Sequence, residues 1–315
     1  MQLYQFFDHP HSVMFHHFYG DQHAKGQGAI SSQDFADLLE WLSSQFNLIG
    51  AREFQKKLLN QNLKSKDICL SFDDGLLCQY DIAAPILEAR NIDAYFFVYT
   101  SPLLGDLNVL EIFRDFRSTQ FADIEEFYAS YFKQAKNHLS ESYSDRHEEY
   151  LKLNYLKEFP FYTESDRWFR YLRDRVLGQQ TYNDLMWSLL KESDYDLKGA
   201  SSRLWMTEKQ VKDLSDKGHS IGLHSYNHPT VMSNLPLPDQ RKEYHANKEH
   251  LEGVIGKQID CMSHPCGNYS PQTLDLLTEM GVQIGFRSSL SEVKIKSNLE
   301  IPRQDHILAF KEMRK

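Results

Sequence analysis

The sequence lacks the features that would point to nucleic acid, a membrane or an exported protein. Lysine and arginine number 35 against 44 aspartates and glutamates, which gives a formal net charge of -9 at pH 7. A phosphate-binding surface needs a basic excess instead. No apolar run approaches the roughly 20 residues of a transmembrane helix, and the first residues show neither the basic start nor the cleavage site of a signal peptide. These absences predict a cytoplasmic protein with no nucleic acid partner and no transmembrane segment.

Cysteine is also scarce, since the chain contains only Cys69, Cys78, Cys261 and Cys266. In the cytosol these thiols are expected to stay reduced. Cys261 and Cys266, with His264 between them, could be interpreted as a metal clip. Structural zinc favours four ligands at tighter spacing, which argues against such a clip.

The most informative stretch is residues 68–75, ICLSFDDG, an apolar run that ends in Asp73, Asp74 and Gly75. Alternation along a strand turns the two carboxylates in different directions. One of them can therefore bind a metal while the other takes a proton from water. The simpler interpretation is a strand followed by an Asp-Gly turn, which is a common arrangement.

A second apolar run, residues 219–223, leads directly into a pair of histidines, His224 and His228. Zinc and similar ions bind imidazole nitrogen together with carboxylate oxygen, and a catalytic site has about three protein ligands and one open position. Asp74, His224 and His228 supply that number, so they are the predicted ligands of a divalent metal, with Zn²⁺ as the first choice. Pro229 disfavours a helix at His228, and no His-Glu-x-x-His motif is present, which argues against a metalloprotease.

Strand and helix patterns alternate in both outer parts of the chain, as in a parallel α/β sheet. Expected strands include residues 12–18, 93–99, 259–262, 282–287 and 299–303. The candidate site residues follow the carboxyl ends of strands, where barrel active sites are built. We therefore predict a distorted (β/α) barrel, with a doubly wound sheet as the alternative.

The alternation stops between residues 101 and 204, where aromatic residues recur at helical spacing. This pattern predicts a large helical insertion with its own small core, or alternatively a lid over the site. The predicted domains are a barrel of residues 1–100 and 205–315 and an insertion of residues 101–204. Four arginines of the insertion suit a phosphate or carboxylate ligand, although helix ion pairs explain them equally well: Arg167, Arg170, Arg173 and Arg175.

The Ser-Phe-Asp-Asp-Gly and His-x-x-x-His-Pro segments resemble the polysaccharide deacetylases, also called NodB-homology proteins or carbohydrate esterase family four. Weaker matches follow in the family's order at residues 263–267, SHPCG, residues 281–286, GVQIGF, and residues 301–303, IPR. The resemblance implies a deacetylase-type (β/α) barrel. It also implies a metal-dependent hydrolase that removes an N-acyl group, acetyl or formyl, from an amino sugar.

The resemblance and the residue chemistry together predict roles for further residues. Asp73 would act as the general base, and the backbone N–H of Cys266 would stabilise the oxyanion. His16, which falls on a Tyr-His position of the family, or His306 would protonate the leaving amine, and the sequence does not choose between them. The residues expected to contact the substrate are Tyr226, Pro265 and Gly267.

The third motif departs from the family pattern, which in most members reads Arg-x-Pro-x-Gly with an aromatic residue after the proline. Here Ser263 replaces the arginine and Cys266 replaces the aromatic residue. We predict that Arg303 supplies the missing charge to Asp73, the alternative being a structural arginine that ends the last strand.

Two other functions remain open at this stage. The chain could be a catalytically inactive carbohydrate-binding relative that kept the fold, or a thiol amidase with Cys266 as nucleophile, although a partner base for that thiol is not recognisable. For the enzyme, the predicted cytoplasmic location favours an intracellular precursor of a cell-surface polysaccharide. Such a substrate would be a nucleotide-linked or lipid-linked amino sugar.

Overall fold

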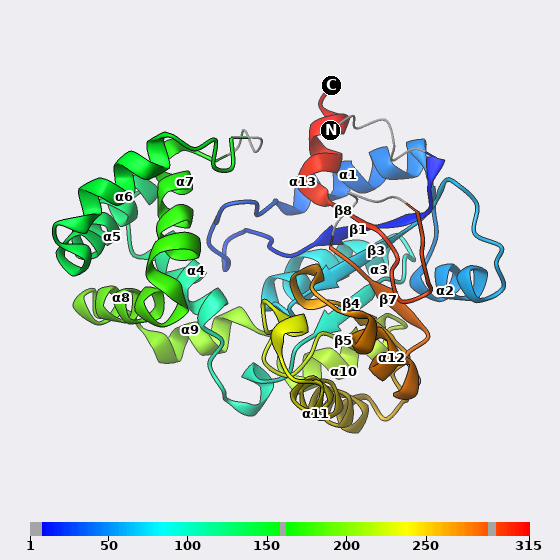
Figure 1. Ribbon diagram of the computed structural model, residues 1–315. Coiled ribbons are helices and arrows are strands. Elements are labelled where there is room, and N and C mark those ends of the chain that lie inside the picture. Colours follow the sequence, from blue (N-terminus) through cyan, green and yellow to red (C-terminus); the bar gives the residue numbers. More distant parts are fainter. Residues whose placement is uncertain (1–7, 158–161, 289–293) are drawn as a thin grey trace. The chain divides into compact units, whose positions relative to one another are not determined.

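The computed structural model describes residues 8–157, 162–288 and 294–315 of the chain (Figure 1). It divides into two compact units. The first combines residues 1–108 with residues 201–315, and the second consists of residues 109–200.

The first unit is built on a parallel sheet in which seven strands follow the order β7-β6-β5-β4-β3-β1-β8, while β2 pairs only with β3. A single bridge between Phe286 and Ile301 brings the segment before β8 against β7, so the sheet nearly closes. This is the predicted distorted (β/α) barrel, and the doubly wound alternative is wrong. The strands are β1 (His11–Phe15), β2 (Asn47–Leu48), β3 (Asp67–Asp73), β4 (Tyr95–Val98), β5 (Ser220–Leu223), β6 (Cys261–Ser263), β7 (Ile284–Phe286) and β8 (Arg303–Asp305).

Helices lie around this sheet (Figure 1), and several begin at the capping signals that the sequence contains. Ser31 and Thr207 each form a capping box, with Asp34 and Gln210 respectively, which satisfies backbone N–H groups of the first turn. The helices of the first unit are α1 (Ser32–Gln45), α2 (Ala51–Leu59), α3 (Ala84–Ala89), α10 (Glu208–Asp216), α11 (Leu237–Ile255), α12 (Pro271–Glu279) and α13 (His306–Met313).

The centre of the barrel is tightly packed around β3, β4 and β5. All seven residues of β3 are buried, as expected for a strand covered on both sides. Gly222 on β5 allows a close approach of its neighbours, because a Cβ atom there would lie 2.5 Å from the ring of Phe97 and 2.9 Å from the carbonyl oxygen of Cys261. The spacing of β5 from its neighbours therefore depends on the absence of a side chain at residue 222.

The last strand begins later than residue 299, where we predicted its start, because β8 spans Arg303–Asp305. Before it, Ile301 donates a hydrogen bond to the carbonyl of Gly285, but Pro302 has no N–H to continue such a ladder. The other predicted strands are shorter than expected. A π-helical turn, Gln79–Ala83, precedes α3.

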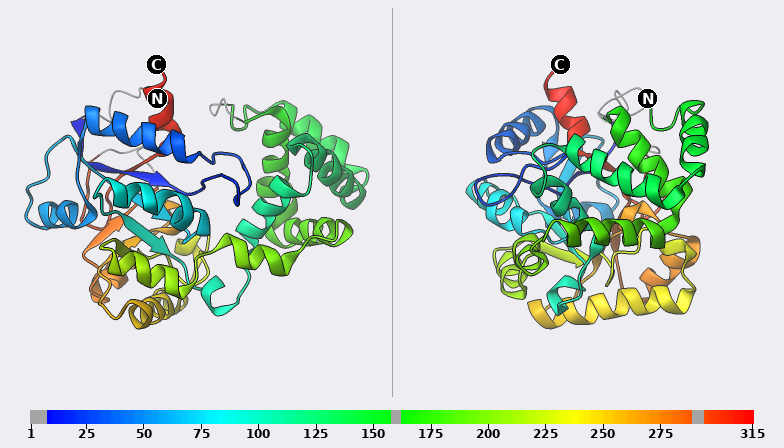
Figure 2. Two further views of the ribbon diagram at one scale, coloured as in Figure 1. Left: turned by 180° about the vertical axis from the view of Figure 1, so that it is seen from behind. Right: turned by 90° about the vertical axis from the view of Figure 1, so that its left-hand side faces the viewer.

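The second unit is entirely helical in its described part, and its helices pack against one another (Figure 2). Phe127, Tyr131 and Phe169 are buried at its centre. Among the four arginines, Arg167 pairs with Glu164 and Arg173 with Asp174, which are the local ion pairs of the alternative interpretation. The helices are α4 (Val109–Thr119), α5 (Ile124–Leu139), α6 (Ser142–Leu151), α7 (Glu164–Tyr171), α8 (Gly178–Glu192) and α9 (Leu197–Leu204), which continues into the first unit.

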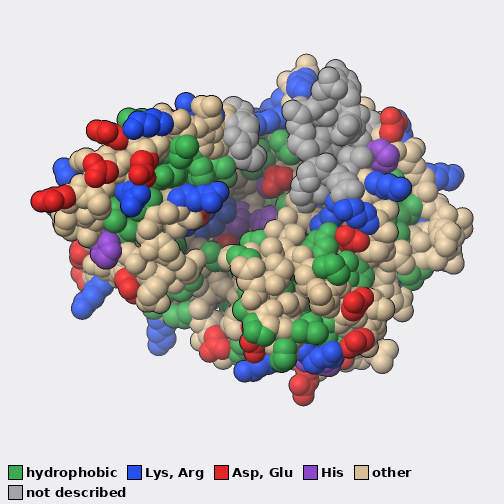
Figure 3. All heavy atoms as spheres, viewed as in Figure 1, with side chains coloured by type: hydrophobic (Ala, Val, Ile, Leu, Met, Phe, Trp, Pro, Cys, Tyr) green, Lys and Arg blue, Asp and Glu red, His purple; other side chains and the backbone are tan. Residues whose placement is uncertain are grey.

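On the face drawn in Figure 3, acidic and basic side chains are interspersed over the surface, without a continuous basic field. Among the described residues, no helix is both long enough and apolar enough to cross a membrane.

Candidate active site

Three strands carry the candidate residues at their carboxyl ends. β3 ends at Asp73 and is followed by Asp74, β5 is followed by His224, and β6 ends at Ser263. Because β3, β4, β5 and β6 pair in parallel, these ends meet at one edge of the barrel. This edge is where barrel folds place their active sites.

Asp74, His224 and His228 form a compact group whose possible ligand atoms all lie within 4.8 Å of one another. The Nε2 atoms of His224 and His228 lie 3.4 and 3.5 Å from Asp74 Oδ1. This buried oxygen has no hydrogen-bond partner among the described residues. Two imidazole nitrogens around an unsatisfied carboxylate oxygen fit a divalent metal such as zinc.

The tautomer of His224 also suits metal binding. Its Nδ1 lies 2.8 Å from the carbonyl oxygen of Ser263, so Nδ1 carries the proton and donates it to that carbonyl. Nε2 is then left with a lone pair toward Asp74. An imidazole oriented in this way by a backbone carbonyl is typical of metal-ligating histidines.

Electrostatics favour the protonation states that a metal requires. Burial would raise the pKa of Asp74, but the close imidazoles of His224, His228 and His16 outweigh it and hold this pKa well below its usual range. Burial lowers the pKa of His228 to about 4. Burial also lowers the pKa of His224, but the carboxylates of Asp73 and Asp74 outweigh burial, and the pKa of His224 is raised. An ionised Asp74 and a neutral His228 are ready to bind a cation.

Asp73 is held by a guanidinium fork from the other side of the barrel. Arg303 Nη1 and Nη2 donate to Asp73 Oδ1 and Oδ2 at 2.6 and 2.7 Å. Nη2 also donates to Ser263 Oγ at 2.8 Å, and Ser263 in turn donates to Asp73 Oδ2 at 3.2 Å. Burial raises the pKa of Asp73, but the charge of Arg303 outweighs it and the pKa is lowered. A bidentate pair of this kind fixes both the charge and the orientation of the carboxylate.

Backbone strain is concentrated at this edge of the barrel. In the described part of the chain, nine residues other than glycine have positive φ, and four of them lie in the site segments: Asp74, Ser225, His228 and Cys266, with φ of 79°, 65°, 55° and 52°. Such conformations cost on the order of 1–3 kcal/mol each and cluster at functional sites. The strain therefore supports the assignment of these turns to the site.

The two candidate proton donors lie in different surroundings. His16 Nε2 lies 4.0 Å from Asp74 Oδ2, and the His16 side chain is 29% exposed. His306 is buried, and its ring nitrogens lie 2.9 and 3.3 Å from the carbonyl oxygens of Gly28 and Met14. Of the two, His16 alone has both solvent access and a short approach to the metal-binding group.

The third motif forms a short turn, Pro265–Gly267, in which Cys266 is exposed and Pro265 is buried. Gly267 has a φ of 64° and packs so closely on Ser288 that a Cβ would lie 2.2 Å from Ser288 Oγ. The hydroxyl of Tyr226 donates to Asp106 at 2.6 Å. The predicted roles of these residues toward the substrate stay predictions.

The metal clip weighed from the sequence does not form. Cys261 is buried and its thiol donates to the carbonyl of Ile221, while His264 Nε2 hydrogen-bonds to the carbonyl of Leu299. In residues 8–157, 162–288 and 294–315, the group of Asp74, His224 and His228 is the one metal-binding arrangement found.

Two buried amides support the site and were not recognised in the sequence. Gln79 Nε2 donates to the carbonyls of Asp73 and His16 at 2.6 and 2.8 Å. Asn247 accepts the backbone N–H of His224 and donates to the carbonyl of Val98. Asn247 could have been recognised in the sequence, because this amide interrupts the apolar stripe of α11. The sequence around Gln79 contains no comparable indication.

Comparisons with known proteins agree with this fold, and the matched family model includes the segment of His224 and His228 but not that of Asp73 and Asp74. Residues 178–285 match the family model for polysaccharide deacetylase. The protein named "Putative polysaccharide deacetylase YxkH" from Bacillus subtilis (strain 168) is 29% identical over 80 residues, which cover 25% of this chain and 28% of that protein. The resemblance inferred from the sequence motifs is confirmed, although the match spans little more than a quarter of that relative.

Solved structures extend the similarity of fold to nearly the whole chain. IcaB from Ammonifex degensii has a TM-score of 0.57 and 16% identity, with 96% of this chain and 97% of that one covered. The deacetylase PplD from Streptococcus pyogenes, solved in complex with acetate, has a TM-score of 0.53 and 15% identity, with 94% and 92% covered. At such identities the likeness shows the fold alone.

Proposed function

We propose that the protein is a metal-dependent carbohydrate deacetylase that hydrolyses the N-acyl group of an amino sugar. The observation that carries this proposal is the pairing of two groups at one barrel edge. One is the cation-binding set Asp74, His224 and His228. The other is Asp73, which is held by Arg303 and lies 3.8 Å from His224 Nε2. A site for a Lewis acid beside a fixed carboxylate base is the arrangement that hydrolysis of an unactivated amide needs.

The donor set favours zinc, since it offers two imidazole nitrogens and one carboxylate oxygen and leaves a position open. Asp74, His224 and His228 would hold the ion. When bound, it would polarise the acyl carbonyl and lower the pKa of a neighbouring water molecule.

Asp73 would take the proton of the attacking water, and its hydrogen bonds indicate which oxygen does so. A carboxylate has about four lone-pair sites. Arg303 occupies one on each oxygen, and Ser263 occupies a second one on Oδ2. The remaining site is on Oδ1, which we assign as the proton acceptor.

Two further groups complete the proposed reaction. The backbone N–H of Cys266 lies in a strained turn next to the carboxyl end of β6 and would stabilise the developing oxyanion. His16 would deliver a proton to the leaving amine, because it has access to solvent and lies near Asp74, whereas His306 is hydrogen-bonded to backbone carbonyls. Gln79 would act as a positioning residue, since it holds the carbonyls of both Asp73 and His16.

The deciding experiment measures the acid released from defined substrates by protein that has been purified without chelator. Acetate and formate release would be followed with N-acetylated amino-sugar polymer, with a nucleotide-linked amino sugar and with a lipid-linked amino sugar. The last two represent the intracellular precursor that we propose from the sequence. We expect activity that disappears on chelation, returns with Zn²⁺ and is absent in Asp73→Asn.

Saturable binding of these sugars without release of acid, in protein that contains metal, would contradict the enzyme and favour the carbohydrate-binding alternative. Activity on the polymer alone would contradict the precursor as substrate. Activity that survives complete metal removal would contradict the metal-dependent mechanism.

A further inference from the structure

The first unit contains a polar cavity at the opposite ends of the strands from the candidate active site. It has a volume of about 420 Å³ and is lined by side chains that include Arg52, Glu88, Asp93, Lys217 and His219. β4 begins at Tyr95 and β5 at Ser220, so Asp93 and His219 immediately precede these strands. The metal-binding residues follow the other ends of the strands.

His219 presents a buried hydrogen-bond donor in this cavity. The backbone N–H of Ala94 donates to His219 Nδ1 at 3.2 Å, so Nδ1 is the unprotonated nitrogen and the ring proton of the neutral form lies on Nε2. Burial lowers the pKa of His219, which keeps the ring neutral. His219 is only 5% exposed, yet Nε2 has no hydrogen-bond partner among the residues described. A buried donor without an acceptor is unfavourable, and an acceptor atom of a ligand would relieve it.

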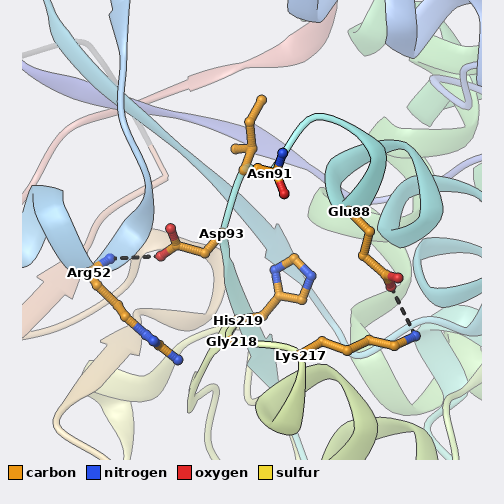
Figure 4. Close-up of a pocket in the computed structure, with 8 residues that line it drawn as sticks. Arg52, Glu88, Asn91, Asp93, Lys217, Gly218 and His219 are labelled. Atoms are coloured by element: carbon orange, nitrogen blue, oxygen red, sulfur yellow. Dashed lines mark hydrogen bonds and ion pairs between the residues drawn. The ribbon is translucent and has the colours of Figure 1, made fainter.

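Figure 4 shows the ring of His219 with Glu88 and Lys217 on one side and Arg52 and Asp93 on the other. On one side Lys217 pairs with Glu88 at 3.0 Å and also with Asp213 at 2.8 Å, so its charge is balanced. On the other side the carboxylate of Asp93 accepts a hydrogen bond from the backbone N–H of Arg52 at 3.0 Å. The exposed guanidinium of Arg52 has no hydrogen-bond or ion-pair partner in the described part of the chain. Arg52 and His219 thus both offer donors to the cavity, as does the side-chain amide of Asn91, which also lines it.

We propose that this cavity binds a small molecule through a single carboxylate group. The guanidinium fork of Arg52 matches a carboxylate in geometry and charge, and the Nε2–H of His219 would donate to the same group. The four charged side chains at the cavity, two cationic and two anionic, sum to zero. A monovalent carboxylate therefore fits beside Asp93 and Glu88 with less repulsion than a phosphate, which carries more charge near neutral pH.

The probe for the test is acetate, and the readout is the Nε2–H signal of His219 in protein labelled with ¹⁵N at histidine. The signal is assigned by its loss in His219→Phe. We expect a saturable shift with a dissociation constant on the order of millimolar, as suits a ligand of few atoms. Arg52→Gln should weaken binding about tenfold or more, since one charge-assisted fork is worth on the order of 1.5–3 kcal/mol. The matched control is Lys56→Gln, an exposed position on the same helix α2 with the same change of charge, and it should leave binding unchanged.

This site is independent of the proposed metal centre, so Asp74→Ala should retain the His219 shift, even if that variant has lost its metal. An absent shift at saturating acetate would overturn the proposal, as would an equal shift in Arg52→Gln. Tighter binding of inorganic phosphate than of acetate would overturn the assignment to a monovalent carboxylate.

Discussion

Asp73 and Asp74 are neighbours in the chain, yet their side chains make entirely different contacts. Asp73 is the last residue of β3 and is hydrogen-bonded by Arg303 and Ser263. Asp74 leaves the strand with a φ of 79° and faces His224 and His228. Successive residues of a strand point to opposite sides, and the turn at Asp74 increases this separation. Two identical side chains can therefore have two functions, ligand and base.

The first prediction tests this division between the carboxylates. Asp74→Ala should lose the bound metal, because one of three ligands is removed, whereas Asp73→Asn should retain it and lower kcat by about 10²–10⁴-fold, the usual contribution of a general base. Metal content and turnover are measured on the same preparations. Metal loss in Asp73→Asn together with metal retention in Asp74→Ala would reverse the assignment.

The second prediction concerns Arg303, which is 1% exposed. Arg303→Ala leaves the buried carboxylate of Asp73 without its partner, so we expect it to lower the free energy of unfolding by about 3–5 kcal/mol. It should also lower kcat, because the base is no longer held in place. Adding Ser263→Arg to this variant should recover part of both losses, since the new guanidinium replaces the missing charge. Denaturant unfolding and turnover test this, and an Arg303→Ala protein of unchanged stability and rate would contradict it.

At the scale of secondary-structure elements, the site depends on how closely the strands approach and on which helix holds their ends. Asn247 of α11 joins the carboxyl ends of β4 and β5, because it hydrogen-bonds to both Val98 and His224. Gly222, two residues before His224, lies against Phe97 of β4 and Cys261 of β6. The positions of the two histidines that we propose as metal ligands are therefore coupled to the packing inside the barrel.

The third prediction uses two glycines with opposite surroundings. Gly222→Ala should destabilise the protein by about 1–3 kcal/mol, as overpacking of a dense core does, because β5 must move away from Phe97. Gly253→Ala is the matched control, since a Cβ there would meet nothing within 4 Å and residue 253 lies inside helix α11. That substitution should stabilise the protein by up to about 1 kcal/mol. Thermal and denaturant unfolding of both variants provide the measurement, and equal effects of the two would contradict the packing argument.

At the scale of the whole molecule, buried neutral histidines make stability depend on pH. His11, the first residue of β1, is fully buried, and its Nδ1 donates a hydrogen bond to the carbonyl oxygen of His9. Burial lowers the pKa of His11 from 6.5 to about 4. The unfolded chain therefore binds a proton between pH 6.5 and 4 that the folded protein does not bind, so stability falls as the pH falls through this range.

The fourth prediction follows from this loss of stability at lower pH. His11 should contribute a loss of up to about 3 kcal/mol in the free energy of unfolding between pH 7 and pH 4, at about 1.4 kcal/mol per pH unit of pKa difference. His11→Gln should make the dependence on pH shallower, whatever its effect at pH 7. His245→Gln, at an exposed position of α11, is the control and should leave the slope unchanged. Equal slopes for His11→Gln and the parent protein would contradict the assignment.

We also propose that residues 101–204 form a domain inserted into the barrel, which the two compact units support. The aromatic spacing that led to this proposal reflects packing within the helical unit. Two of the four arginines form local ion pairs, Arg167 with Glu164 and Arg173 with Asp174, as expected of ordinary helix side chains.

The sequence by itself determined the features that depend on neighbours in the chain. The capping boxes at Ser31 and Thr207 and the turn at Pro229 arise from contacts within a few residues, and the apolar run of residues 68–72 marks a buried strand before its partners are known. The barrel could also be predicted, because the alternation of strands and helices specifies a parallel sheet whose carboxyl ends meet. For the same reason Asp74, His224 and His228 could be expected to lie together.

Only the tertiary structure decided the contacts that depend on strand order and register. Arg303 reaches Asp73 across 230 positions of sequence, because β8 lies beside β1 and β1 beside β3. The local sequence pattern likewise could not choose between His16 and His306, because both lie next to a strand end. His16 follows β1, and His306 begins α13 directly after β8. Burial against backbone carbonyls separates them, and that burial exists only once distant segments have packed together.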